Sequence, residues 1–217
     1  MNHELNTILI EKTTAFVRLS LQNAEAGHDW WHVERVHRTA LKIADGLNLN
    51  LLVVELAALL HDIADSKFHD GDENIGVETA KLFLLENAVD QDVIKEVLFI
   101  VKHLSFKSSF GFDSPKSIEF QVVQDADRLD AIGVIGIARA FSYGGFKGRL
   151  FYDPAIKIQH FTDISQYKNS KSPTINHFYE KLLLLKDQMN TSRAKEIAEK
   201  RHARMLTFLE NFYEEWG

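Results

Sequence analysis

The chain has no cysteine among its 217 residues, and this absence limits the chemistry available to it. Disulfide bonds and thiolate metal sites are excluded, so any metal ion must be bound by histidine, aspartate or glutamate. Proline occurs only three times and glycine 11 times. Because both residues interrupt helices, their scarcity allows long helical segments.

An excess of positive charge and a long apolar segment are also missing. The formal net charge is −6, whereas a protein that coats a nucleic-acid polymer needs a basic face. No apolar run approaches the roughly 20 residues of a membrane span, and the start MNHELNTILIEK lacks the basic and apolar regions of a signal peptide. We therefore expect a cytoplasmic protein that binds neither a membrane nor a nucleic-acid polymer. A nucleotide remains compatible, because it needs only a local basic pocket.

Apolar residues recur at three- and four-residue steps along most of the chain, which is typical of α-helices. The segment 31–49 has its apolar residues on one face, and Gly46 is a plausible stop signal. Residues 51–65 are apolar almost all round, as in a buried helix. Further helices are predicted over 74–87, 90–104 and 117–145, with a short strand over 118–124 as an alternative.

These segments predict one all-α domain over residues 1–217, built as a helical bundle. Its core region covers about 27–140, and the glycine-containing segment from about 143 to 173 is predicted to be a long functional loop or lid. A helical hairpin over about 174–213 turns near MNTS. The apolar stripes of this hairpin are expected to close the core, and their use in a homodimer is the alternative.

Four polar side chains in these apolar segments have a spacing that suits a metal site. His61 and Asp62 interrupt the apolar run LLHDIAD, while His32 and Asp127 lie on two other predicted helices. Facing helices of a bundle are a common place for metal ligands. Each residue alone also has a simpler explanation, such as a core histidine or a buried ion pair. Burying all four without partners would be costly, and a divalent cation would offset that cost for the whole set.

With these residues in this order, the chain resembles the HD-domain metal-dependent phosphohydrolases, whose signature is H…HD…D. The segments GHDWWHVERV, LLHDIADSKF, VKHLSF, QDADRLDAIGVIGIARAF and HFYEKLLLLKDQMNT are similar to a bacterial branch associated with nucleotide pyrophosphohydrolase activity. The resemblance covers about residues 27–213. It implies an all-helical HD-type fold and metal ligands at His32, His61, Asp62 and Asp127.

Two imidazoles and two carboxylates suit one divalent transition metal ion, namely manganese, iron, cobalt, nickel or zinc. Magnesium is less natural because it prefers oxygen ligands. Family members with two metals generally supply further histidines between the His-Asp pair and the last aspartate. Only His69 and His103 are available there, so we expect one ion and keep two as the alternative.

Other residues are candidates for acting on the substrate. Asp65 lies one helical turn after Asp62, and the family often has an acid there that orients or deprotonates water. His103 is a candidate substrate ligand, general acid or ligand of a second metal. His28 shares a predicted helix face with His32, so it is either the alternative first ligand or a neighbour of the site. The candidate phosphate-binding residues are Arg35, Lys67, Arg128, Lys147 and Arg149.

Several of these candidates have equally simple roles. Arg128 can pair with a nearby aspartate, and Lys147 and Arg149 can belong to a solvated loop. The predicted activity is hydrolysis of a nucleotide phosphate bond, with conversion of a (deoxy)nucleoside triphosphate to the monophosphate and pyrophosphate as the specific hypothesis. The alternatives are a nucleotide monophosphatase or phosphodiesterase and a non-catalytic nucleotide sensor that keeps the metal.

Overall fold

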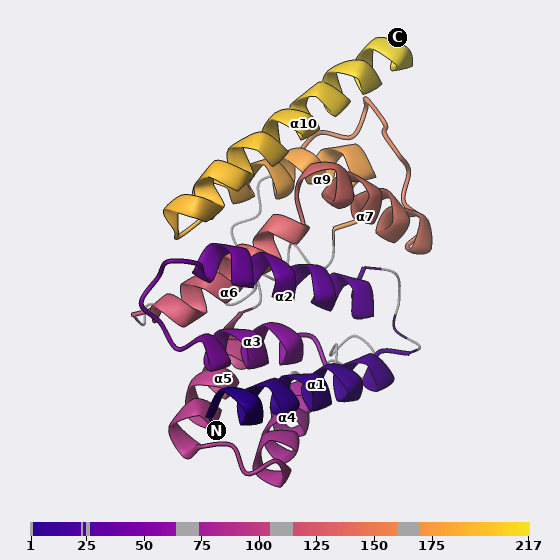
Figure 1. Ribbon diagram of the computed structural model, residues 1–217. Coiled ribbons are helices and arrows are strands. Elements are labelled where there is room, and N and C mark those ends of the chain that lie inside the picture. Colours follow the sequence, from indigo (N-terminus) through magenta and orange to yellow (C-terminus); the bar gives the residue numbers. More distant parts are fainter. Residues whose placement is uncertain (1, 23, 25–26, 64–73, 105–114, 160–169) are drawn as a thin grey trace. The chain divides into compact units, whose positions relative to one another are not determined.

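The computed structural model describes residues 2–22, 24, 27–63, 74–104, 115–159 and 170–217 (Figure 1). Within these ranges every regular element is a helix, which confirms the all-α prediction. The alternative of a strand over 118–124 is wrong, because these residues lie in helix α6 (Ile118–Asp130). None of the described helices combines the length and the apolar character that crossing a membrane requires.

The chain forms two compact units, residues 1–126 and residues 127–217. The boundary falls inside α6, so this helix starts in the first unit and ends in the second. The expectation of a single domain over 1–217 remains a prediction.

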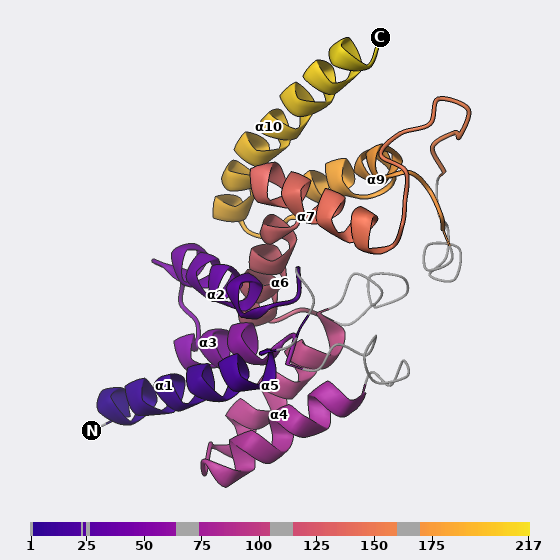
Figure 2. The same cartoon turned by 90° about the vertical axis from the view of Figure 1, so that its right-hand side faces the viewer.

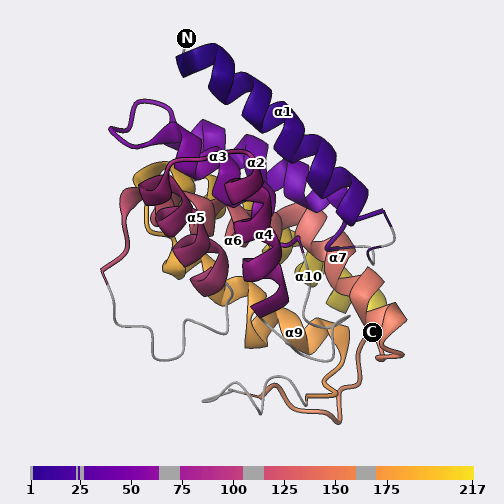
Figure 3. The same cartoon turned by 90° about the horizontal axis from the view of Figure 1, so that it is seen from below.

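The first unit contains α1 (Asn2–Ser20), α2 (Trp30–Ala44), α3 (Leu51–Leu60), α4 (Asn74–Glu86), α5 (Gln91–His103) and residues 118–126 of α6. Helix α3 packs against α1, α2 and α5, and Figures 1 and 2 show it between α1 and α2. Helix α4 packs against α5, as Figure 3 shows. This position explains the largely apolar sequence of α3, because seven of its ten residues are buried.

Two aspartates set the start of helices in this unit. Asp29 is the N-cap of α2, and its carboxylate accepts a hydrogen bond from the backbone N–H of His32 at 3.0 Å. Asp90 caps α5 in the same way, accepting from the N–H groups of Asp92 and Val93. Such caps satisfy backbone donors that have no partner within the helix. Helix α2 ends at Ala44, shortly before Gly46, whose φ is +80°.

The second unit contains the end of α6, then α7 (Gly133–Phe146), α9 (Thr174–Glu180), the 3-10 helix η3 (Leu182–Gln188) and α10 (Ser192–Trp216). Helix α10 packs along α7 and η3, and α9 packs against both of these elements. The predicted hairpin is present with its turn before Ser192, but its first arm is divided between α9 and η3.

The prediction of a continuous helix over 117–145 is wrong, because the chain turns at residues 131–132. Gly133 begins α7 with a φ of +77°, a conformation that side chains with a Cβ rarely adopt. The predicted loop from 143 also begins too early, since α7 continues to Phe146.

Candidate metal centre

His32 lies in the first turn of α2 and has only 1% of its surface exposed. The cap provided by Asp29 holds the backbone of this turn, so the imidazole is presented from a fixed position. Val33 and Val36 on the same helix are fully buried, which fixes the rotation of α2 about its axis. The apolar face of α2 therefore places His32 in the interior of the first unit.

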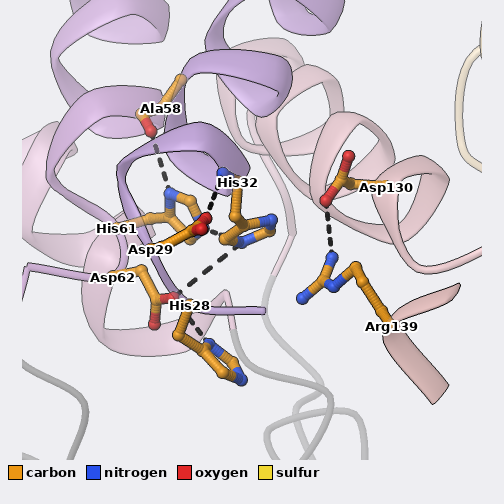
Figure 4. A network of polar contacts seen from close by, with 8 residues as sticks. All are labelled: His28, Asp29, His32, Ala58, His61, Asp62, Asp130 and Arg139. Carbon is orange, nitrogen blue, oxygen red and sulfur yellow. Dashed lines mark hydrogen bonds and ion pairs between the residues drawn. The ribbon is translucent and has the colours of Figure 1, made fainter. Parts of the chain in front are cut away.

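His61 is the C-cap residue of α3, where the helix ends. Its Nδ1 lies 2.9 Å from the carbonyl oxygen of Ala58, so Nδ1 carries the proton and donates. The lone pair of the ring is then on Nε2, which lies 3.2 Å from Nε2 of His32 (Figure 4). A carbonyl partner on the far nitrogen is typical of histidines that bind a metal.

His32, His61 and Asp127 each offer one ligand atom, and these atoms lie within 4.8 Å of one another. Nitrogen ligands bind such ions at about 2.0–2.1 Å, so two of them on one ion lie roughly 3.0–3.4 Å apart. The observed Nε2–Nε2 distance of 3.2 Å falls in this range. The donor set therefore fits a divalent transition metal ion.

Asp62, the fourth predicted ligand, has a histidine partner of its own. Its Oδ2 accepts a hydrogen bond from Nδ1 of His28 at 2.7 Å and lies 3.9 Å from Nε2 of His32. Burial alone would raise the pKa of Asp62, but the hydrogen bond and the positive charge of His28, with smaller effects from the other two histidines, hold it well below its usual range. Asp62 is thus an ionised carboxylate beside the histidine pair.

His28 does not share a helix face with His32, because α2 starts at Trp30 and His28 precedes the cap. That expectation is wrong, and the physical reason is the capping role of Asp29. His28 reaches the site from the turn before the helix and contacts Asp62 (Figure 4).

The remaining predicted site residues have different positions. Arg35 follows His32 by one turn of α2 and is half-buried, and His103 ends α5 with its ring centroid 4.9 Å from that of Phe99. Burial, and then the charge of Lys102, lower the pKa of His103. Asp65, Lys67 and His69 lie outside the described residues.

The three cationic candidates of the second unit contact the protein itself. The guanidinium of Arg128 is buried and donates to the carbonyl oxygen of Gln188. Arg149 donates to the carbonyl oxygen of Ser170 at 2.9 Å, and its guanidinium lies over the ring of Tyr143. Lys147 lies over the same ring at 5.7 Å and is exposed to solvent. Their assignment to the substrate remains a prediction.

Two features of this region were missed from the sequence. Asp29 has the signal of a capping residue before an amphipathic helix, which could have placed the start of α2. The ion pair between Asp130 and Arg139, at 2.6 Å, has no such signal because it depends on the turn between α6 and α7 (Figure 4).

The sequence and the fold were compared with known proteins. The family model described as HD domain matches residues 30–132. The Bacillus subtilis protein YpgQ is 37% identical over 202 residues, which cover 92% of this chain and 89% of that protein.

Solved structures agree with the sequence comparison. A Lactobacillus plantarum protein has a TM-score of 0.84 and 38% identity over 95% of this chain and 96% of its own. An HD-superfamily hydrolase from Bacillus thuringiensis has a TM-score of 0.75 and 44% identity, with 97% and 98% covered. YpgQ of Bacillus subtilis, solved in complex with ADP, has a TM-score of 0.73 and 34% identity, with 95% and 97% covered.

Proposed function

Since this chain belongs to the HD-domain family of metal-dependent hydrolases, we propose that it hydrolyses a nucleoside triphosphate to the monophosphate and pyrophosphate. Water adds to the α-phosphorus, the bond from this phosphorus to the bridging oxygen breaks, and a proton is released. The nucleotide is supported by the likeness to YpgQ, whose structure contains ADP. The alternatives are hydrolysis of a monophosphate or phosphodiester, and nucleotide sensing without turnover.

The observation that carries the proposal is the meeting of His32, His61 and Asp127, with Asp62 beside the two histidines. These four residues would hold one divalent ion, with manganese, iron, cobalt, nickel or zinc as candidates. Such an ion lowers the pKa of a bound water and polarises a phosphoryl oxygen.

The chain's own contribution is to keep the donors ready for binding. The hydrogen bond to Ala58 fixes the tautomer of His61, and the cap from Asp29 fixes the turn that carries His32. Because both imidazoles are held in place before the ion binds, binding costs little further conformational entropy.

We propose substrate contacts for the ionisable residues named as candidates from the sequence, of which Asp65 has the role that the family resemblance implies. We propose Asp65 as the residue that orients or deprotonates water, and His103 as the residue that contacts the substrate or acts as general acid. Positive charge stabilises the equatorial oxygens in phosphoryl transfer. The residues proposed to supply it are Arg35, Lys67, Arg128, Lys147 and Arg149.

The first test is the metal content of the purified protein, measured by mass spectrometry for the wild type, His61→Ala and Asp62→Ala. We expect about one transition metal ion per chain in the wild type and its loss in both variants. His37→Gln is the matched control, because His37 contacts Glu55 at 3.3 Å and belongs to no predicted ligand set. A wild-type protein that takes up no manganese, nickel or zinc would refute the metal-dependent mechanism.

The second test identifies the bond that is cleaved. The manganese-loaded protein is incubated with nucleoside tri-, di- and monophosphates in water enriched in oxygen-18. The products are then separated, and the oxygen-18 in each is measured by mass spectrometry. Labelled monophosphate with unlabelled pyrophosphate supports the proposal. Release of phosphate from monophosphates supports the monophosphatase, and tight binding without any product supports the sensor.

A further inference from the structure

The last turn of α6 carries Asp127 and is joined to α7 by an ion pair. Nη1 of Arg139, on α7, donates to Oδ2 of Asp130 at 2.6 Å. The Asp130 side chain is 5% exposed and that of Arg139 is 21% exposed. An ion pair with so little solvent contact is screened weakly and has a defined geometry, unlike a pair on the surface.

The corner that follows this turn is held by further contacts. The guanidinium of Arg201, on α10, donates to the carbonyl oxygen of Leu129. Gly133 lies against the side chain of Arg201, where an added Cβ would be 3.0 Å away. At Gly136 a Cβ would collide with the carbonyl oxygen of Ala131. The turn between α6 and α7 is therefore packed closely against α10 at Gly133 and against α7 itself at Gly136.

Asp127 and Asp130 are three residues apart on α6, so they lie on one face of the helix. Fixing the carboxylate of Asp130 consequently fixes the rotation of the turn from which Asp127 projects. The ligand group that contains Asp127 also contains His32 and His61. The contribution of Asp127 to this group thus depends on the turn of α6 that the pair of Asp130 and Arg139 holds.

We propose that Arg139 is a positioning residue that, through its ion pair with Asp130, holds the carboxylate of Asp127 where a metal ion requires it. This inference rests on the proposed function, because it assigns a purpose to the ion pair only if the ligand group binds a metal. Arg139 itself touches neither the ion nor the reacting atoms in this assignment.

The test is the affinity of metal-free protein for Mn²⁺, measured by titration calorimetry. Arg139→Met is expected to weaken binding about tenfold, the lower end of the range for residues that orient metal ligands. Arg139→Lys keeps the charge and is expected to recover part of the loss. The visible spectrum of the Co²⁺-loaded variant should also change, because the spectrum responds to the ligand geometry.

Lys186→Met is the matched control. It also removes a cation from the second unit, one that pairs with Asp187 at 3.3 Å and Glu199 at 3.4 Å. Its Mn²⁺ affinity and its Co²⁺ spectrum are expected to equal those of the wild type.

A double variant separates positioning from the effect of removing only one charge of the pair. Arg139→Met combined with Asp130→Asn removes both charges, so this variant also serves if Arg139→Met fails to fold. The proposal expects the double variant to bind Mn²⁺ about tenfold more weakly than the wild type. Wild-type affinity in either variant would overturn it, whatever the loss of thermal stability. If the wild type binds no metal, the proposed function fails as well, and the two failures are thereby distinguished.

Discussion

The contact between His28 and Asp62 leads to a prediction that separates two roles for His28. The 2.7 Å hydrogen bond joins an imidazole to an ionised carboxylate, and such bonds contribute about 1.5–3 kcal/mol when well buried. The His28 side chain is 30% exposed and that of Asp62 is 17% exposed, so solvent screening reduces this contribution. We take about 1 kcal/mol, which corresponds to roughly a fivefold change in a dissociation constant.

His28→Ala is therefore expected to weaken Mn²⁺ binding by roughly fivefold, because Asp62 loses the partner that orients its carboxylate. The assay is calorimetric titration of metal-free protein at neutral pH, with His32→Ala measured alongside. Removing His32 deletes a ligand and is expected to reduce binding by more than 100-fold, since a ligand contributes more than its supporting partner.

Two outcomes would refute this reasoning. A loss as large as that of His32→Ala would mean that His28 is itself a ligand, which the spacing of the two histidines had left open. An affinity equal to that of the wild type would mean that Asp62 does not need His28 to reach the ion.

Two further predictions concern the second unit. Burial, followed by the charges of Lys181 and Arg149, lowers the pKa of His177 to about 3. As the pH falls below about 6.5, the imidazole of His177 becomes protonated in the unfolded chain but stays neutral in the folded chain. The free energy of unfolding should then fall as the pH is lowered from 6.5 towards 3. In urea titrations with a chelator present, the free energy of unfolding should differ between pH 7 and pH 5 by about 1–2 kcal/mol less in His177→Gln than in the wild type. The same pH dependence of the free energy of unfolding in both proteins would contradict this. Gly136→Ala should lower the free energy of unfolding by about 1–3 kcal/mol because its Cβ meets the Ala131 carbonyl. Gly145→Ala, which meets no atom within 4 Å in the same helix, should be neutral or stabilising, and equal losses in both variants would exclude the collision as the cause.

The sequence predicted the elements of the fold whose pattern is local. The apolar residues of α3 indicate a buried helix because no face of it is polar, and α3 does pack between other helices. The prediction failed at residues 131–132, where an apolar helical period continues across a turn. Gly133 was the available signal, but a glycine within such a period indicates a turn only when its φ is known.

The candidate site shows the same division between local and long-range information. His32, His61 and Asp127 could be grouped from their order and their helices, and the structure brings their ligand atoms together. The contact of His28 with Asp62 could not be foreseen in this form, because it depends on the cap at Asp29 that ends the helix first. The pair of Asp130 and Arg139 depends on the turn between α6 and α7, which sequence periodicity did not reveal.

The position of Asp127 within the chain also has a consequence for biosynthesis. Synthesis proceeds from the N-terminus, so helices α1 to α5 have left the ribosome before Asp127 does. A nascent chain that stops before this residue can bring the two histidines together, but it cannot complete the ligand group. The complete ligand group can therefore form only late in the synthesis of the chain, once Asp127 has been added.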